Sequence, residues 1–222
     1  MSRPQTADRR QQVRWLPTAD CLLPSVYCGL MLLGVSVPET RAEDAAATPV
    51  EVVIYSFEGG PQGWAIPDWA RSSKDYVARE CVVSEAFAGQ GKDALDIQTD
   101  FPGKVWAGAY VERQVETTDW TPFGVLSADL YVPEHSPRGL RGRIILTVGN
   151  TWEWTEMNHG VKLEPGRWTT VSANLKPGSL DWKFFPTDQF RANVRKIGIR
   201  IESDKDPAYR GSIFLDNIRL SE

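Results

Sequence analysis

Residues 213–220 read Ile-Phe-Leu-Asp-Asn-Ile-Arg-Leu, a strand-like apolar run with a single carboxylate, Asp216, at its centre. A matching run near the start of the folded part, residues 55–60, reads Tyr-Ser-Phe-Glu-Gly-Gly and carries Glu58. The first and last strands of a β-sandwich can lie side by side, so we expect the two carboxylates to meet at one edge. Paired carboxylates need a cation, and hard oxygen ligands favour calcium.

Short strand-like runs alternate with turn residues along the rest of the chain. The runs cover 50–57, 76–84, 94–99, 104–115, 124–132, 143–148, 169–173, 194–202 and 211–220. Glycine and proline stand between them, as in the segments 89–91 and 165–166. Many short strands separated by such turns are typical of an all-β domain. A turn or two of helix is expected only at 187–194, and residues 50–222 are expected to form one domain.

Alternation of apolar and polar residues indicates which faces of the strands are buried. In residues 196–202 three isoleucines share one face, and in 126–132 the even-numbered residues are apolar. Asp129 and Tyr131 are left on the outer face of the run 126–132, and Trp106, Tyr110 and Glu112 on the outer face of the run 105–112. If the two strands that carry them are neighbours, aromatic and acidic groups share one sheet face, which is typical of a surface that binds sugars.

Residues 1–42 are interpreted as a signal peptide. Four arginines lie in the first 14 residues, residues 21–37 are mostly apolar, and small residues precede an acidic pair at Glu43-Asp44. This order is typical of a leader that is cleaved, here near Ala42, and it predicts a secreted or periplasmic protein.

The alternative for the apolar run is a single membrane anchor. Pro24 and Gly29 interrupt the run, which is also slightly short for a membrane span, so the cleaved leader is favoured. We therefore expect no membrane span in the mature chain, and residues 43–49 are interpreted as a flexible lead-in to the domain.

The charge and cysteine content of the mature chain exclude some classes of function. The whole chain has 25 Lys and Arg and 29 Asp and Glu; without the five basic and three acidic residues of the leader, the net charge is −6. A mildly acidic domain is a poor candidate for nucleic-acid binding. Cys81 is the one cysteine outside the leader, so no intramolecular disulfide is expected, and it is interpreted as a small buried hydrophobe.

Five segments resemble, in the same order, the galactose-binding-like jelly rolls, and among them the carbohydrate-binding modules of families 4, 11 and 22. They are Phe57-Glu58-Gly59 with Gly63-Trp64, Gly89 to Leu95, Asp119-Trp120 with 126–132, Pro165 to Val171, and Gly211 to Leu220. The resemblance covers most of residues 50–222. It implies a two-sheet antiparallel jelly roll, which is the β-sandwich that the strand pattern also indicates.

The resemblance also implies a structural calcium ion. Its ligands would be the side chains of Glu58 and Asp216, joined by backbone carbonyls near Gly60 and the 91–93 turn. In this position calcium would pin the terminal strands together and would not act on a ligand, so its loss should lower the stability of the native state.

Eight tryptophans of the mature chain are candidates for the core or for sugar stacking. Trp64, Trp120 and Trp168 match motif positions that are usually packed inside, and Trp69 and Trp182 are weaker candidates for a ligand. The segment 149–156 is aromatic and acidic and is the best candidate for a ligand-contacting element. The predicted binding residues are Trp106, Tyr110, Glu112, Asp129, Tyr131, Trp152, Glu153 and Trp154.

The function indicated by these features is non-catalytic binding of a polysaccharide or oligosaccharide by an exported module, with a glycan-processing enzyme as a possible partner. One alternative is a small polysaccharide hydrolase or lyase, for which Glu153 and Glu156 are the local carboxylate pair. It requires an acid with a raised pKa. The other alternative is a cell-envelope interaction protein that kept the fold without a sugar site, which predicts that Trp152 and Trp154 are buried.

Overall fold

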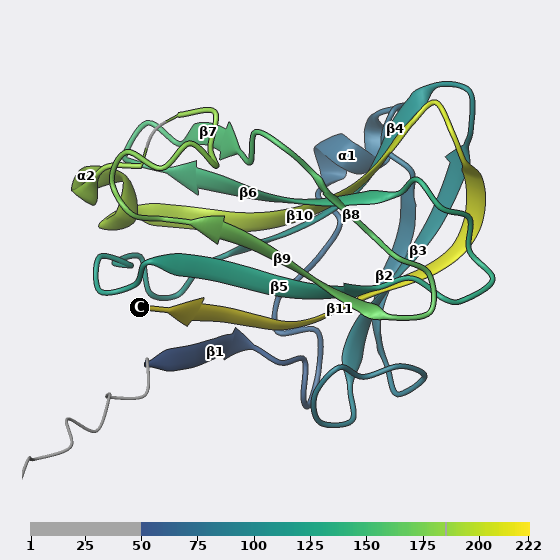
Figure 1. Ribbon diagram of the computed structural model, residues 1–222, viewed down its shortest axis with the longest axis horizontal. Coiled ribbons are helices and arrows are strands. Elements are labelled where there is room, and N and C mark those ends of the chain that lie inside the picture. Colours follow the sequence, from purple (N-terminus) through teal and green to yellow (C-terminus); the bar gives the residue numbers. More distant parts are fainter. Residues whose placement is uncertain (1–49, 185) are drawn as a thin grey trace, which may run out of the picture. The chain divides into compact units, whose positions relative to one another are not determined.

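The computed structural model describes residues 50–184 and 186–222 (Figure 1). Two antiparallel sheets pack face to face. Sheet A contains β1 (Glu51–Tyr55), β2 (Ala78–Ser84), β3 (Ala94–Pro102), β5 (Val125–Tyr131), β9 (Trp168–Asn174) and β11 (Ala208–Ser221). Sheet B contains β4 (Trp106–Gln114), β6 (Arg141–Val148), β7 (Glu153–Glu156), β8 (Val161–Lys162) and β10 (Val194–Asp204). The interpretations of residues 1–42 and 43–49 lie outside the described residues.

The predicted all-β, two-sheet β-sandwich is confirmed. The strand order is β2-β3-β11-β5-β9 in sheet A, where β1 also pairs with β11, and β4-β10-β6-β7 in sheet B, where β8 also pairs with β6. All nine expected runs contain a strand, and α2 (Asp188–Arg191) lies in the expected helical segment. The short strands β7 and β8 and the five-residue helix α1 (Asp68–Ser72) were not expected, because such short elements show no periodicity.

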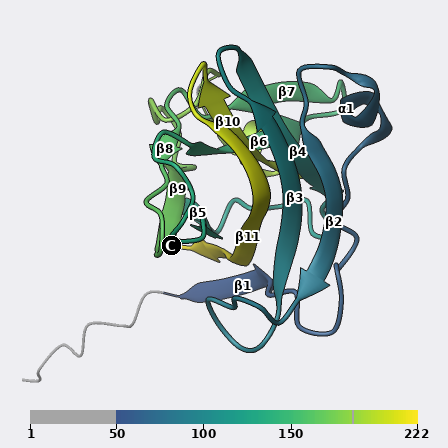
Figure 2. The same cartoon turned by 90° about the vertical axis from the view of Figure 1, so that its right-hand side faces the viewer.

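Strand β11 organises sheet A. Its first half pairs with β3, from Ala208 opposite Pro102 to Leu215 opposite Leu95, and its last residues pair with β1 and with β5. The first and last strands of the domain are therefore neighbours, as the sequence predicted, and Figure 2 shows β1 beside the curved end of β11.

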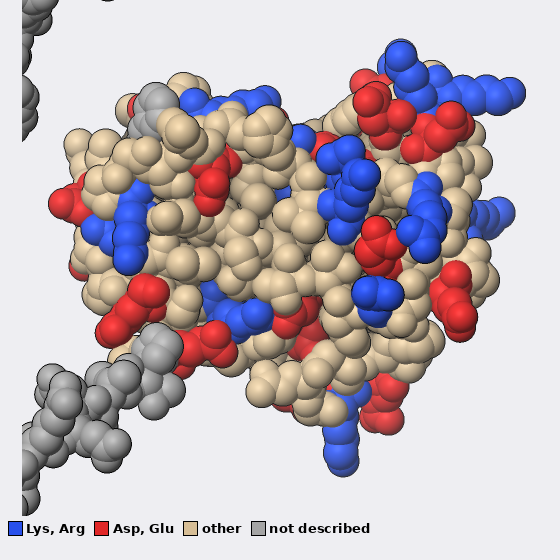
Figure 3. Space-filling view, viewed as in Figure 1, with Lys and Arg blue, Asp and Glu red and all other residues tan. Residues whose placement is uncertain are grey.

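The core lies between the inner faces of the two sheets. The three isoleucines of β10 are fully buried, as are Leu126, Ala128 and Leu130 of β5, so the alternation in the sequence assigned the inner faces correctly. On the outside, basic and acidic side chains lie next to one another in the view of Figure 3, beside a broad uncharged area. No helix among the described residues is both long enough and apolar enough to cross a membrane.

Two carboxylates hold a single turn, residues 89–93. The side chain of Asp216 is fully buried, and its Oδ2 accepts hydrogen bonds of 2.9 Å from the backbone N–H groups of Gly89 and Gln90. Oε1 of Glu58 accepts from Lys92 N–H at 2.8 Å and from Asp93 N–H at 3.0 Å. We name Glu58, Asp216 and residues 89–93 the carboxylate clasp.

The clasp requires glycine at position 91. Gly91 has a φ of +71°, and a Cβ at this position would lie 2.1 Å from Oε1 of Glu58. Burial raises the pKa of Asp216, and the nearby Glu58 carboxylate raises it further, whereas backbone N–H donors lower the pKa of Glu58. The two carboxylates therefore bind opposite ends of one turn, which supplies N–H groups to both.

Replacing Asp216 by asparagine should destabilise the domain. In the unmodified protein the backbone N–H donors of the turn bind a carboxylate. The asparagine amide has the same size but offers them an NH₂ group or a neutral oxygen. We therefore expect the free energy of unfolding to fall by about 1–3 kcal/mol. Urea denaturation measures this loss. The Glu164→Gln variant, which removes an exposed carboxylate outside the clasp, is the control and should change stability little. Equal stability of Asp216→Asn and the unmodified protein would contradict the clasp.

Candidate functional site

Five aromatic side chains gather on the outer face of sheet B. They come from β4, from β7, and from α1 with the segment after it, and we name them the aromatic cluster: Trp69, Tyr76, Trp106, Tyr110 and Trp154. Trp69 is central, with ring centroids 5.2 Å from Tyr110, 6.1 Å from Trp154 and 5.0 Å from Tyr76. Figures 1 and 2 show α1 beside β4 and β7, which places Trp69 against both strands.

Strand register explains why these residues share a face. Tyr110 of β4 lies opposite Arg200 of β10, which lies opposite Arg143 of β6, so every second residue of each strand points to the same side. Trp154 of β7 lies opposite Thr147 of β6 and belongs to the same set.

Three rings of the aromatic cluster are partly exposed to solvent, whereas the ring of Tyr110 is buried against them. Trp69 is 42% exposed, and Trp106 and Trp154 are each 38% exposed, whereas Tyr110 is 1% exposed. The Tyr110 hydroxyl donates to Glu112 Oε2 at 3.0 Å, and burial holds its pKa well above the ordinary value. A Cβ on Gly198 would lie 2.2 Å from the Tyr110 hydroxyl, so only glycine at this position lets the phenol lie across β10.

A network of ion pairs lies beside the aromatic cluster. Arg200, 8% exposed, pairs with Glu156 at 2.8 Å and with Glu202 at 3.1 Å, and Glu202 also pairs with Arg143 at 2.7 Å. Lys196 pairs with Glu112 at 2.6 Å. Because each carboxylate is held by a cation, the surface combines fixed polar groups with exposed aromatic rings.

Four members of this network, Arg143, Glu156, Arg200 and Glu202, line an open groove of about 610 Å³. Trp106 forms one side of it, and the Arg200 guanidinium lies 5.7 Å from the Trp106 ring centroid. Asn158 and His159 contribute further hydrogen-bonding groups. An aromatic wall beside hydrogen-bonding groups suits a ring-shaped ligand with an apolar face and hydroxyl groups at its edge.

Glu156 is an ionised member of the network. Burial raises its pKa, but the charges of Lys183 and Arg200 and their hydrogen bonds outweigh this effect, so the pKa lies below its ordinary value of 4.5. A carboxyl group with a lowered pKa is poorly suited to donate a proton at neutral pH.

The predicted residues Trp152 and Glu153 lie where β7 begins. Trp152 has a φ of +58° and is 50% exposed, and the ammonium of Lys196 lies 5.9 Å from its ring centroid. Glu153 is exposed and accepts a hydrogen bond from Thr151. Because Glu153 lies opposite the core residue Val148, it points to the other side of β7 from Trp154. Five of the eight predicted binding residues, namely Trp106, Tyr110, Glu112, Trp152 and Trp154, therefore lie on or at the edge of the outer face of sheet B.

The predicted residues Asp129 and Tyr131 lie on the other sheet. The expectation that their strand neighbours the one with Trp106 is wrong, because β5 belongs to sheet A and β4 to sheet B. Asp129 accepts hydrogen bonds from Asn217 and Arg219, both at 2.8 Å, and these bonds connect β5 with β11. Alternation indicates the face on which a residue lies but not which strands pair, so the sequence could not separate the two sets.

Four tryptophans show how far the sequence motifs specify burial. Trp64 and Trp120 are buried, as predicted. Trp168 was expected inside, but it is only half-buried and lies against Tyr131 on the outer side of sheet A, with ring centroids 5.4 Å apart. Trp182, a weak ligand candidate from the sequence, is 1% exposed in the core, and its indole N–H donates to the Asn174 carbonyl.

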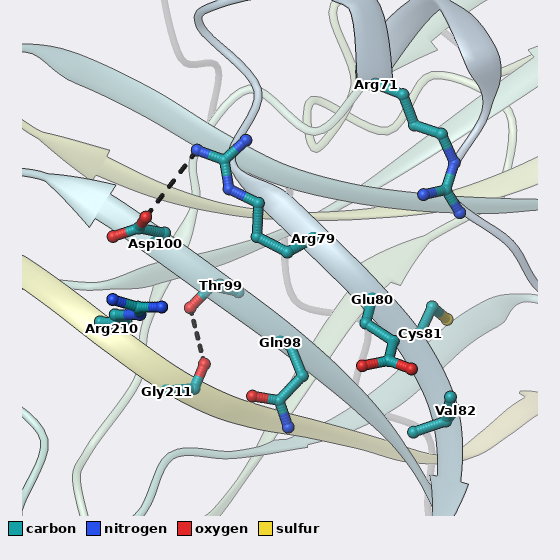
Figure 4. A pocket seen from close by; sticks show the side chains of 10 residues that line it. All are labelled: Arg71, Arg79, Glu80, Cys81, Val82, Gln98, Thr99, Asp100, Arg210 and Gly211. Carbon is teal, nitrogen blue, oxygen red and sulfur yellow. Dashed lines mark hydrogen bonds and ion pairs between the residues drawn. The ribbon is translucent and has the colours of Figure 1, made fainter.

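The outer face of sheet A is also hollowed. A polar groove of about 770 Å³ lies across β2, β3 and β11, and the side chains of Arg79 and Asp100 in it are 4.0 Å apart. Figure 4 shows the side chains that line this groove. Cys81 lines this groove and is half-buried, and burial raises the pKa of its thiol to about 12. A thiol with such a pKa is a poor nucleophile, in agreement with a packing role.

The carboxylate oxygens of the clasp are the type of ligand that calcium prefers. Two carboxylates lie close enough for the charge of Glu58 to raise the pKa of Asp216, and a cation between them would relieve this repulsion. Among residues 50–184 and 186–222, no group of three or more His, Cys, Asp or Glu side chains could hold a metal ion. Further ligands at the clasp would therefore be backbone carbonyls.

Comparison with known proteins defines the class of the fold. No family model and no curated protein matches the chain. A solved structure of CBM28, described as a carbohydrate-binding module specific for non-crystalline cellulose, aligns with a TM-score of 0.57 and 16% identity over 77% of this chain and 94% of the module. CBM27-1 of Caldicellulosiruptor saccharolyticus, solved in complex with mannohexaose, aligns with a TM-score of 0.53 and 18% identity over 77% of this chain and 96% of the module.

A third structure, from a study of carbohydrate-binding modules of the β-sandwich superfamily, has a TM-score of 0.54 and 16% identity over 76% of this chain and 61% of that chain. The chain therefore has the fold of the β-sandwich carbohydrate-binding modules. The resemblance inferred from five sequence segments is confirmed at the level of the fold.

The ion-pair network makes stability dependent on pH through Glu156. Its pKa in the folded state is below its ordinary value of 4.5, so its pairing contributes to stability above that pH and the contribution is lost as the pH falls through the folded-state pKa. Replacement of Glu156 by glutamine should therefore destabilise the protein at neutral pH, and the difference should shrink in acid.

Denaturant titrations of both proteins across this pH range measure the effect. Glu164→Gln, which removes one partner of an exposed pair with Arg138, is the control and should change stability little at any pH. A Glu156→Gln difference that is independent of pH would contradict the assigned pairing.

Proposed function

We propose that this chain is an exported, non-catalytic polysaccharide-binding protein that holds sugar rings on the outer face of sheet B. The observation that carries the proposal is the exposure of Trp69, Trp106 and Trp154 beside a groove lined by paired charges. Export rests on the leader pattern of residues 1–42. A separate glycan-processing enzyme is a suitable partner, because this chain would bind the polymer without cleaving it.

Each part of the face has a distinct task in this mechanism. The indole rings of Trp106 and Trp154 would stack on the C–H faces of successive sugar rings. Arg200 and Glu202 would exchange hydrogen bonds with sugar hydroxyls, and their mutual ion pair fixes them before the ligand arrives, so little side-chain entropy is lost on binding. Buried Tyr110 supports the rings from below.

The structural relatives suggest the ligand class. The solved modules of the same fold are described as binding mannohexaose and non-crystalline cellulose. A neutral, hydroxyl-rich chain of this kind also suits a groove in which four of the charged side chains already pair with one another. We therefore propose a neutral glucan or mannan chain as the ligand.

The two rival functions find less support. A hydrolase needs a carboxyl group that stays protonated, whereas the pKa of Glu156 is lowered by its cationic partners. An interaction protein without a sugar site predicts that Trp152 and Trp154 are buried, but they are 50% and 38% exposed.

We also propose that Glu58 and Asp216 hold a structural calcium ion. When bound, the ion would neutralise the two carboxylates and so stabilise the carboxylate clasp. The chain's own N–H groups at residues 89–93 already orient both side chains toward the same turn.

Removal of the two exposed tryptophans tests the binding face. The double variant Trp106→Ala/Trp154→Ala should bind cellohexaose or mannohexaose about ten- to a hundredfold more weakly, since each aromatic contact contributes about 0.5–1.5 kcal/mol. Isothermal titration calorimetry measures the affinity, after a glycan array has identified the better ligand. The matched control is Phe184→Ala, an exposed aromatic outside the cluster, which should bind normally. Unchanged binding by the double variant would refute the assigned face.

Chelation tests the metal. EDTA should lower the melting temperature of the protein, and added Ca²⁺ should restore it, because an ion that binds only the native state stabilises it by mass action. The Glu58→Gln variant should not respond to either treatment. A melting temperature that EDTA leaves unchanged in the unmodified protein would argue against calcium and would leave the sugar site unaffected.

A further inference from the structure

A second aromatic surface lies on the outer face of sheet A. Phe87, in the loop after β2, stacks on Tyr131 of β5 with ring centroids 4.6 Å apart and an interplanar angle of 24°. Phe214 of β11 lies 5.1 Å from Phe87, and Trp168 lies 5.4 Å from Tyr131. Phe87 is 40% exposed, so part of its ring is accessible to a ligand.

A buried carboxyl group without a full set of partners lies beside these rings. Asp96 of β3 is 8% exposed, and its Oδ2 accepts hydrogen bonds from Gln98 at 2.8 Å and Ser212 at 3.2 Å. Its Oδ1 is buried and has no hydrogen-bond partner among the described residues. A buried oxygen without a partner is costly, so this atom is poised to accept a hydrogen bond from a ligand or a water molecule.

Phe87, Tyr131, Phe214 and Asp96 line one cavity. Its volume is about 600 Å³, within the range of about 300–1,000 Å³ that is typical of small-molecule sites. His135 and Tyr209 also line it. At Gly211 the cavity adjoins the polar groove of Figure 4, so a ligand longer than one ring has room to continue across β11.

The carboxylate clasp fixes the position of Phe87. Asp216 binds Gly89 and Gln90, two and three residues after Phe87, and Trp168 packs close to Gly89. The loop that carries the exposed ring is therefore anchored to the central strand of sheet A. A ring held in this way loses little conformational entropy when a ligand stacks on it.

We infer that this cavity is a second saccharide-binding site, independent of the face on sheet B. One pyranose ring stacks with its apolar face on Phe87, and a hydroxyl group of the sugar donates a hydrogen bond to Oδ1 of Asp96. Polar groups that also line the cavity, Glu134 and His135, distinguish the site from a purely apolar docking patch. With two sites on opposite sheets, one molecule can hold two chains or two segments of one chain, which raises avidity for an insoluble polymer.

The test uses NMR titration of the ¹⁵N-labelled protein with the methyl glycosides of glucose, galactose, mannose and xylose at millimolar concentrations. At least one of them should shift the backbone amides of residues 86–90, 131–135 and 209–214. The same shifts should occur in the Trp106→Ala/Trp154→Ala variant, because the two faces are separate. Phe87→Ala should weaken this binding about tenfold, whereas Phe87→Trp, which keeps a stacking ring, should retain it.

The outcomes separate this inference from the function proposed for sheet B. If none of the four glycosides shifts these amides, or if Phe87→Ala binds as well as the unmodified protein, the second site is refuted whatever sheet B does. If the shifts persist while no oligosaccharide binds to sheet B, the second site stands and the proposed function of sheet B fails. Asp96→Asn, which replaces a charged acceptor by a neutral one, should weaken binding severalfold without unfolding the protein.

Discussion

The structure depends on one buried carboxylate, that of Asp216, which sits on the central strand of the larger sheet. A carboxylate without solvent contact must be compensated, and here three backbone N–H groups, from Gly89, Gln90 and Asn217, point at its two oxygens. This requirement fixes the turn at 89–93 against β11, and Glu58 holds the other end of the same turn. The clasp thereby connects the segment after the first strand with β11, the longest strand, and holds the edge of the sandwich closed.

On the outer face of sheet B, buried charges are likewise compensated by partners. Arg200 and Glu202 are as buried as many apolar residues, and they are tolerated because Arg200 pairs with Glu156 of β7 and Glu202 pairs with Arg143 of β6. A face built in this way keeps its polar groups in place and leaves three tryptophans partly exposed. Fixed hydrogen-bonding groups beside exposed rings are what a polysaccharide requires, and this combination links the strand register to the proposed function.

The sequence predicted the sandwich and much of the site because both depend on alternation. The isoleucines of β10 and the outward position of Trp106 and Tyr110 followed from every second residue. Alternation carries no information on which strands pair, so Asp129 and Tyr131 were grouped with the wrong sheet. Trp69 was rated a weak candidate because the five-residue helix that carries it has no periodicity, and its central place in the cluster arises from contacts with β4 and β7 that are distant in sequence.

The most direct measurement uses the indole N–H signals of the tryptophans as reporters of position. In a ¹⁵N NMR titration with the oligosaccharide that binds best, the account predicts that the indole signals of Trp69, Trp106 and Trp154 move, because their rings are exposed on the outer face of sheet B. The signals of the buried Trp64, Trp120 and Trp182 should remain in place. If the polysaccharide binds while the first three signals stay unchanged, sheet B is not the binding face and the central claim is wrong.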